Sequence, residues 1–182
     1  KFSFLGIEES KSTGALLIGR APHIAESAWL NRLYSPIDKN EIIKMEDGIS
    51  KKIPTSYVDF LTNFSNGLNI LGDTLCLFGY RSNYVRTVDF SWQPYSLISF
   101  NKYDKPRNST GEMLFIGSYD WDGSLLYMTT DEKVHFCNRD DSTSLFIWDS
   151  LSSMLISELK RIYNIFDSSG IQIDDTQATT PI

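Results

Sequence analysis

The chain has 182 residues, which is enough for one compact domain, and no break in its composition is long enough to separate two domains. Its formal net charge of −6 and pI of about 4.9 argue against a phosphate-binding surface, because nucleic acid is recognised through clustered lysine and arginine. We expect a basic protein partner instead, although mild acidity can also serve solubility alone.

No apolar run approaches the ~20 residues that span a bilayer, and the run from Ala15 to Ile18 is too short for the core of a signal peptide. We therefore expect a soluble, cytoplasmic protein that has no membrane partner. The chain begins with Lys1 rather than methionine, so a removed targeting segment stays open as an alternative. The two cysteines, Cys76 and Cys137, lack the spacing of a zinc site and are expected to be buried free thiols.

The first 37 residues predict short strands and a helix. Residues 2–7 and 14–19 have the composition of two short strands separated by a polar loop. Pro22 is expected to begin a helix that carries Ala25, Trp29 and Leu33. This helix should end at Ser35-Pro36, because the residue before a proline avoids helical backbone. We interpret residues 1–37 as an N-terminal extension packed on a main domain, residues 38–166.

Two amphipathic helices are expected next. Asp38 and Glu41 have the spacing of a capping box, and apolar residues follow at intervals of three to four: Ile42, Met45, Ile49 and Ile53. Pro54 suits the first turn of the second helix because its φ is already helical, and Gly67 can adopt the positive φ that ends it. One apolar stripe on this helix consists of Tyr57, Phe60, Leu61 and Phe64.

From Thr74 onward the pattern has a period of two and is rich in β-branched and aromatic residues. It predicts six strands, at residues 74–80, 84–90, 95–101, 112–118, 124–130 and 133–137. Short turns between consecutive strands indicate an antiparallel sheet, and residues 101–111 and 138–144 are polar loops.

A final helix is expected to open at Trp148, with one apolar face: Leu151, Leu155, Leu159, Ile162 and Phe166. The tail, residues 167–182, is poor in apolar residues and is expected to be flexible. Helices before and after a run of strands predict an α+β domain, a twisted antiparallel sheet of about five to six strands with helices packed on one face. The other face of the sheet and its loops would then be free to hold a ligand.

The chain carries little that indicates catalysis. GxSxG, HExxH and a complete phosphate-binding loop are all absent. His135 and Cys137 are two residues apart on one strand face, a spacing that seldom brings a nucleophile and its base together. Asp120 and Asp122 lack the further ligands of a calcium loop, so a solvated turn is the better interpretation. We expect no enzyme activity, no cofactor and no metal.

The segment Tyr119-Asp120-Trp121-Asp122 suits a protein interface, because exposed tyrosine and tryptophan bury large area and carboxylates meet lysine or arginine. Trp121 could equally cover one end of the core. On the same reasoning, Asp73 and Trp92 are further candidates for partner binding, with a turn residue and a loop anchor as the alternative interpretations.

Three pieces of this sequence, taken in order, resemble the SUKH superfamily, the Smi/Knr-type domain. They are the stretch Ile53-Pro-Thr-Ser-Tyr-Val-Asp-Phe-Leu-Thr-Asn-Phe-Ser-Asn-Gly67, the stretch Glu112-Met-Leu-Phe-Ile-Gly-Ser-Tyr-Asp-Trp-Asp-Gly-Ser-Leu-Leu-Tyr127, and the helix opened by Trp148. The resemblance covers roughly residues 38–166 and implies a SUKH-like fold. The family's glycine-rich turn is here aromatic and acidic, and about 35 residues precede the matching region.

The resemblance implies a role in immunity, since many bacterial members bind and neutralise a cognate polymorphic toxin, often a nuclease. We therefore expect a monomeric, non-catalytic protein that occludes the active site of a basic toxin. The alternative is a regulatory or scaffold domain that binds a peptide or a housekeeping protein, as fungal members of the family are regulators. The sequence does not identify the toxin, its activity or the stoichiometry.

Overall fold

The computed structural model describes residues 1–85, 87 and 91–182. Within this part of the chain, nine strands form one antiparallel sheet in which the spatial order is the order along the chain. The strands are β1 (Ile7–Glu9), β2 (Leu16–Arg20), β3 (Trp29–Leu33), β4 (Leu68–Ile70), β5 (Leu75–Leu77), β6 (Leu114–Tyr119), β7 (Leu125–Met128), β8 (Val134–Cys137) and β9 (Phe146–Trp148). The sheet is therefore a meander in which each strand pairs with the next.

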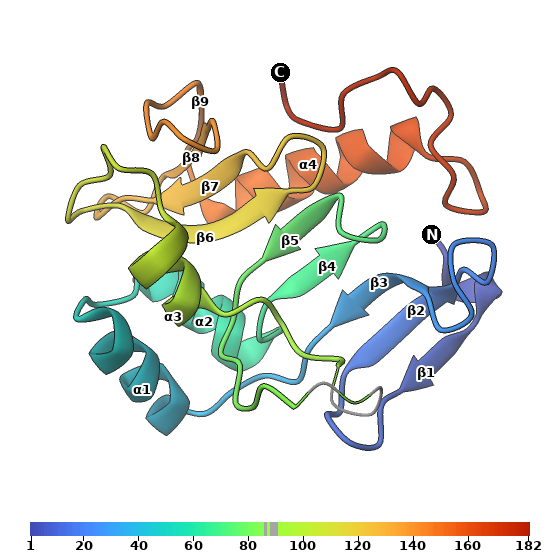
Figure 1. Ribbon diagram of the computed structural model, residues 1–182, viewed down its shortest axis with the longest axis horizontal. Helices are drawn as coiled ribbons and strands as arrows, with labels where there is room; N and C mark the ends of the chain where they lie inside the picture. The colour runs from blue at the N-terminus through green and yellow to red at the C-terminus, as the bar shows by residue number, and fades with distance from the viewer. Residues whose placement is uncertain (86, 88–90) are drawn as a thin grey trace.

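Helices occupy the two long connections of this meander, after β3 and after β5, and also precede β1 and follow β9. They are η1 (Ser3–Leu5), α1 (Lys39–Ile49), α2 (Thr55–Asn63), α3 (Leu97–Ser99), the π-helix η3 (Phe100–Asp104) and α4 (Leu151–Ile165). Figure 1 shows β1 and β2 at the right of the sheet, α1 and α2 at the lower left, and α4 along the top. Among the described residues, no helix combines the length and the apolar character that crossing a membrane requires.

The N-terminal ends of α1 and α2 follow from short sequence motifs. Asp38 and Glu41 form the expected capping box, with the Asp38 side chain accepting from the Glu41 N–H at 2.9 Å and the Glu41 carboxylate accepting from the Asp38 N–H at 3.0 Å. Pro54 is the N-cap of α2 rather than its first helical residue. Gly67, which we expected to end α2, lies beyond the helix, because α2 ends at Asn63 with Phe64 as its C-cap. Gly67 does have a positive φ of 81°, and a Cβ there would lie 2.5 Å from the Leu77 carbonyl oxygen. Only glycine meets both conditions without strain.

The main core lies between one face of the sheet and the helices α1, α2 and α4. Leu68 and Ile70 of β4, and Leu75 and Leu77 of β5, share one buried apolar cluster with these helices. The helix side chains in the cluster are Ile42 and Met45 of α1, Tyr57, Phe60 and Leu61 of α2, and Leu151, Met154 and Ile162 of α4. The chain is thus an α+β protein. A second, smaller cluster joins Phe115, Leu125, Tyr127 and Cys137.

The strand count exceeds the five to six that we expected. β4 and β9 were missed, because each has only three residues and a run of that length cannot display an alternating pattern. Trp148 ends β9 instead of opening the last helix, which begins at Leu151 behind a capping box of Ser150 and Ser153.

The helix expected from Pro22 to Leu33 is wrong. A loop closed by the bond from the Ala21 N–H to the Ala28 carbonyl, 2.9 Å, occupies the first half, and β3 occupies the second. β3 pairs with β2 on one side and with β4 on the other, and this pairing overrides the helical spacing of the apolar residues. The first expected strand is also displaced, since residues 3–5 form η1 and β1 begins at Ile7.

The strand expected at residues 95–101 is also wrong. α3 and η3 occupy this region, because the Ser96 hydroxyl caps the helix by accepting from the Ser99 N–H at 3.1 Å. Of the strand expected at 84–90, the described residues 84, 85 and 87 are not in a strand, and 86 and 88–90 lie outside the described residues. Phe64, expected on the apolar stripe of α2, is 59% exposed.

The tail from Asp167, which we expected to be flexible, makes several contacts with the rest of the chain. Arg161 donates to the Thr179 carbonyl at 2.6 Å, Phe166 pairs with Gln172, and the side chains of Thr179 and Thr180 are buried. The division into residues 1–37, 38–166 and 167–182 stays a prediction.

Candidate functional site

The face of the sheet opposite α1, α2 and α4 carries a row of polar side chains across its middle strands. Register places Arg32 opposite Asn69, Asn69 opposite Cys76, and Cys76 opposite Ser118. Residues directly opposite one another in neighbouring strands point to the same face. These four side chains therefore form one line across β3, β4, β5 and β6, continued by Leu125 of β7.

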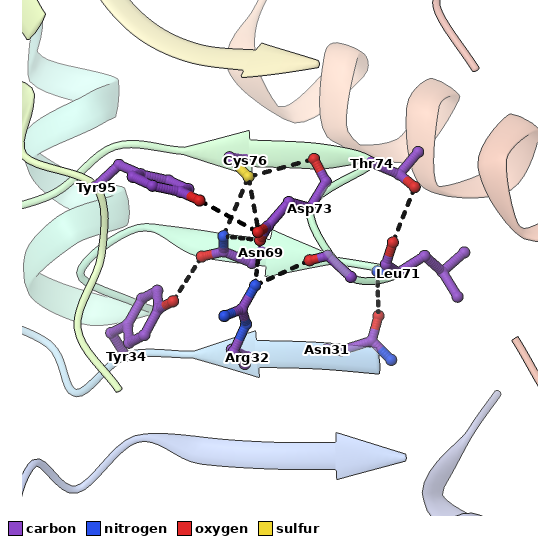
Figure 2. A network of polar contacts seen from close by, with 10 residues as sticks. Asn31, Arg32, Tyr34, Asn69, Leu71, Asp73, Thr74, Cys76 and Tyr95 are labelled. Atoms are coloured by element: carbon purple, nitrogen blue, oxygen red, sulfur yellow. Dashed lines mark hydrogen bonds and ion pairs between the residues drawn. The ribbon is translucent and has the colours of Figure 1, made fainter. Parts of the chain in front are cut away.

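Asp73, in the turn between β4 and β5, is the centre of a polar network on this face. Its Oδ1 atom forms an ion pair with Arg32 and accepts a hydrogen bond from the Asn69 side chain, while its Oδ2 atom accepts from the Tyr95 hydroxyl at 3.2 Å. Figure 2 shows Arg32, Asn69 and Tyr95 pointing toward the Asp73 carboxylate from β3, β4 and the segment before α3. Both carboxylate oxygens of Asp73 are thus engaged within the chain.

Tyrosine and cysteine side chains complete the network. The Tyr34 hydroxyl donates to the Asn69 side-chain oxygen at 2.6 Å, and the Cys76 thiol lies 3.1 Å from the Asn69 side-chain nitrogen. Burial raises the pKa of Tyr95 to about 12 and the pKa of Cys76 well above 9.0, and the Asp73 carboxylate adds to both shifts. Burial also raises the pKa of Tyr34. All three groups are therefore neutral at pH 7.

A hollow of about 690 Å³ opens beside this network. Its lining consists of Asp73, Cys76, Tyr95, Phe100, Asp104, Ser118, Tyr119, Asp120, Trp121, Asp122, Gly123, Leu125, Arg139 and Asp140. Among these residues there are five aspartates and one arginine, so the hollow concentrates negative charge on an otherwise partly apolar wall. Five of the six candidates chosen from sequence border this hollow together: Asp73, Tyr119, Asp120, Trp121 and Asp122.

The turn from β6 to β7 places the acidic and aromatic residues at the mouth of the hollow. The Asp122 carboxylate accepts from the Ser124 N–H at 2.9 Å, and the Tyr119 N–H donates to the Ser124 carbonyl at 2.9 Å. Gly123 has a φ of 74°, which closes the turn. The turn leaves Asp120 and Asp122 exposed and Trp121 45% exposed.

Tyr119 does not belong to the accessible surface. Its side chain is 1% exposed and lies in the main core, where its hydroxyl donates to Oε2 of Glu158 on α4 at 2.7 Å. We therefore withdraw Tyr119 as a side chain that contacts a partner. Its role is to anchor the strand that leads into the turn.

Trp92 lies apart from the hollow that Trp121 borders. It borders two other hollows, one of about 250 Å³ shared with Tyr34 and one of about 790 Å³ shared with Trp29 and Leu17. The indole is half-buried and packs against the small cluster that contains Leu17 and Tyr34. The structure therefore does not bring Trp92 together with the other candidates.

The single histidine in the strands, His135, is engaged in local contacts. Its ring stacks on Tyr127 with a centroid distance of 4.8 Å, and its two nitrogens lie 2.9 Å from the Ser144 hydroxyl and 3.3 Å from the Thr129 hydroxyl. Burial lowers its pKa. Over the part of the chain that is described, no group of three or more His, Cys, Asp or Glu side chains has the arrangement of a metal site.

The sequence did not point to four residues of this polar network: Arg32, Tyr34, Asn69 and Tyr95. A signal existed for Asn69, which is a polar residue between two buried leucine or isoleucine positions. Arg32 gives no such signal, because the spacing of the apolar residues around it predicts a helix.

Comparison with protein-family models finds a match to the model described as SMI1 / KNR4 family (SUKH-1) over residues 36–157. This range covers about two thirds of the chain and contains Asp73, Trp92 and the turn from Tyr119 to Gly123. It confirms the resemblance found in the sequence. A search of curated proteins finds no match.

Proposed function

The chain belongs to the SMI1 / KNR4 family (SUKH-1), and from that premise we propose that it is an immunity protein. In this proposal it binds a basic polymorphic toxin, such as a nuclease, and neutralises it by covering the toxin's active site. It acts in the cytoplasm as a monomer and transforms no substrate.

The observation that carries the proposal is the acidic hollow on the face of the sheet that α1, α2 and α4 leave uncovered. Asp120, Trp121 and Asp122 stand exposed at its mouth, and Asp104 and Asp140 border it from other segments. A nuclease active site is lined by cations that attract phosphate. A surface that presents several carboxylates around an exposed indole complements such a site in charge and adds apolar area.

The clustered negative charge around the hollow should accelerate association with a basic partner as well as stabilise the complex. Clustered carboxylates steer a basic partner during diffusion, and the effect weakens as salt screens it over a Debye length of ~8 Å at physiological ionic strength. Binding should therefore weaken as salt concentration rises, and the association rate should change more than the dissociation rate.

The test is capture of the partner from the native host, followed by an assay of the captured protein. Tagged wild-type protein is compared with a triple variant, Asp120→Asn, Trp121→Ala and Asp122→Asn. Asp59→Asn serves as the matched control, because Asp59 is exposed on α2 and has no ion pair within the described part of the chain. The expected partner is a basic toxin encoded beside this gene, and its activity should fall to zero as the wild-type protein approaches saturation.

Two results would count against the proposal. One is a captured toxin that keeps its full activity at saturation. The other is capture of a regulatory or housekeeping protein, which would instead support the scaffold alternative. Equal capture by the triple variant would show that the partner uses another surface.

A further inference from the structure

We propose that the hollow beside Asp73 is a receptor for one arginine side chain of the partner, with the Trp121 indole as its stacking surface. This inference rests on the proposed function, because it specifies which chemical group of a basic partner the face binds. It commits to a guanidinium group rather than to positive charge in general.

Three carboxylates at the hollow are available for a cation. Asp104, Asp120 and Asp140 are exposed and form no ion pair within the described residues. The other two carboxylates are already engaged, since Asp73 is bound by Arg32 and Asp122 accepts from the Ser124 N–H. A cation that enters the hollow therefore meets free acceptors without breaking the network below it.

The free carboxylates come from three separate segments. Asp104 ends the π-helix η3, Asp120 lies in the turn after β6, and Asp140 follows β8. All three border one hollow of about 690 Å³, a volume in the range of sites that hold a small ligand or a group of side chains. A planar guanidinium group, which has several N–H donors, can bind carboxylates that reach it from different segments.

Arginine fits this lining better than lysine does. The guanidinium group is planar, presents five donors, is weakly hydrated and stacks on aromatic rings, whereas the ammonium group of lysine is a compact and strongly hydrated point charge. Trp121 is 45% exposed beside Asp120, and tryptophan is the strongest aromatic partner of a cation. The phenol of Tyr95 and the ring of Phe100 add apolar wall.

Arg139 also borders the hollow, and removing its positive charge should change the affinity in the opposite direction to removing a carboxylate. Arg139 lies over Gly123, where a Cβ would be 3.0 Å from the Arg139 Cδ atom, and among the described residues it forms no ion pair. Its charge repels an incoming guanidinium. Removing that charge should tighten binding of an arginine probe, while removing a carboxylate should weaken it.

The experiment is an NMR titration of the isotope-labelled full chain with two capped glycine–serine peptides, one with a central arginine and one with a central lysine. The chain has four tryptophans, so four indole N–H signals report separately. We expect the arginine peptide to shift the Trp121 signal selectively and to bind roughly fivefold more tightly than the lysine peptide. Asp120→Asn should weaken the arginine peptide by ~3-fold, and Arg139→Gln should tighten it by a similar factor.

Asp59→Asn is the control and should leave both affinities unchanged. Equal binding of the arginine and lysine peptides would overturn the inference, and so would shifts at Trp29 or Trp92 in place of Trp121. Either result leaves the immunity proposal intact if the host toxin is still captured in a way that depends on Asp120. Failure to capture a toxin, with arginine selectivity retained, would instead reject the proposed function alone.

Discussion

The hydroxyl of Tyr119 donates to Oε2 of Glu158 at 2.7 Å, across the main core from β6 to α4. Glu158 is 1% exposed, and its carboxylate also binds the guanidinium of Arg161, which in turn donates to the Thr179 carbonyl. One buried carboxylate thus connects the strand that leads into the Asp120–Asp122 turn with the last helix and the tail.

We expect Glu158→Ala to lower the free energy of unfolding by about 3 kcal/mol, because it leaves Arg161 without its charge partner and Tyr119 without an acceptor. Tyr119→Phe should cost about 1 kcal/mol, since only one hydrogen bond is lost. Urea denaturation measures both effects. Ser157→Ala, at an exposed neighbouring position on α4, should change stability by less than ~0.5 kcal/mol, and equal losses at Glu158 and Ser157 would contradict this account.

Asp73 and Asp120 border the same hollow but should respond to substitution in opposite ways. Asp73→Asn removes the charge that pairs with Arg32, whose side chain is only 20% exposed, and should destabilise the fold by about 2 kcal/mol. Asp120→Asn should change stability by less than ~0.5 kcal/mol, because this exposed carboxylate forms no ion pair in the described part of the chain.

For partner binding we expect the larger effect from Asp120→Asn and the smaller effect from Asp73→Asn. At a temperature where both variants are folded, Asp120→Asn should weaken binding of the partner or the arginine peptide, and Asp73→Asn should leave it near the wild-type value. Denaturation curves and binding titrations on the same samples make the comparison. A loss of affinity in Asp73→Asn as large as that in Asp120→Asn would show that Asp73 contacts the partner directly.

Stability should fall as pH rises above about 9, because of the two buried thiols. Burial raises the pKa of Cys137 from 9.0 to about 12 and the pKa of Cys76 well above 9.0. Above pH 9 the unfolded chain releases these protons while the folded chain keeps them, so the stabilisation present below pH 9 is lost progressively toward pH 12. Each thiol contributes at most ~1.4 kcal/mol per pH unit.

Urea denaturation at pH 7 and at about pH 10 tests this dependence. A double variant, Cys76→Ser and Cys137→Ala, should lose markedly less stability over that interval than the wild type, whatever its stability at pH 7. If the two proteins show the same slope, other groups control the alkaline loss.

Gly123 is expected to be essential to the geometry of the binding turn. Its φ of 74° is strained for other residues, and an alanine Cβ would lie 3.0 Å from the Arg139 Cδ atom. Gly123→Ala should therefore cost ~1–2 kcal/mol of stability and should weaken partner binding by shifting Trp121. Gly111→Ala is the matched control, because no atom lies within 4 Å of a Cβ there, and it should be neutral within ~0.5 kcal/mol.

Expectations that rest on local motifs agree with the structure. The capping box of Asp38 and Glu41, the positive φ of Gly67, and the strands β6, β7 and β8 each follow from a few neighbouring residues whose backbone preferences are strong. The end of α2 does not, since the helix ends at Asn63 and not at Gly67. Expectations fail where pairing between distant segments decides the outcome. The apolar spacing of β3 predicts a helix, and its pairing with β2 and β4 cannot be predicted from neighbouring residues alone.

The candidate site divides in the same way. The exposed aromatic and acidic character of Asp120, Trp121 and Asp122 could be predicted from the composition of one turn. The burial of Tyr119 could not be predicted in this way, because it depends on which face of β6 the helix α4 covers. The Asp73 network was not readable either, since Arg32, Asn69 and Tyr95 come from three segments up to about sixty residues apart.

Composition, short motifs and periodicity were enough to predict the acidic balance, the family, the α+β class and the N-terminal ends of α1 and α2, because each of these is a local property of the chain. Two features required the folded chain: the described residues place nine strands in one sheet, and Asp104, Asp120 and Asp140 meet at one hollow. The physical reason is that strand register and helix packing select which face of each strand is buried, and both arise from contacts between residues far apart in the chain.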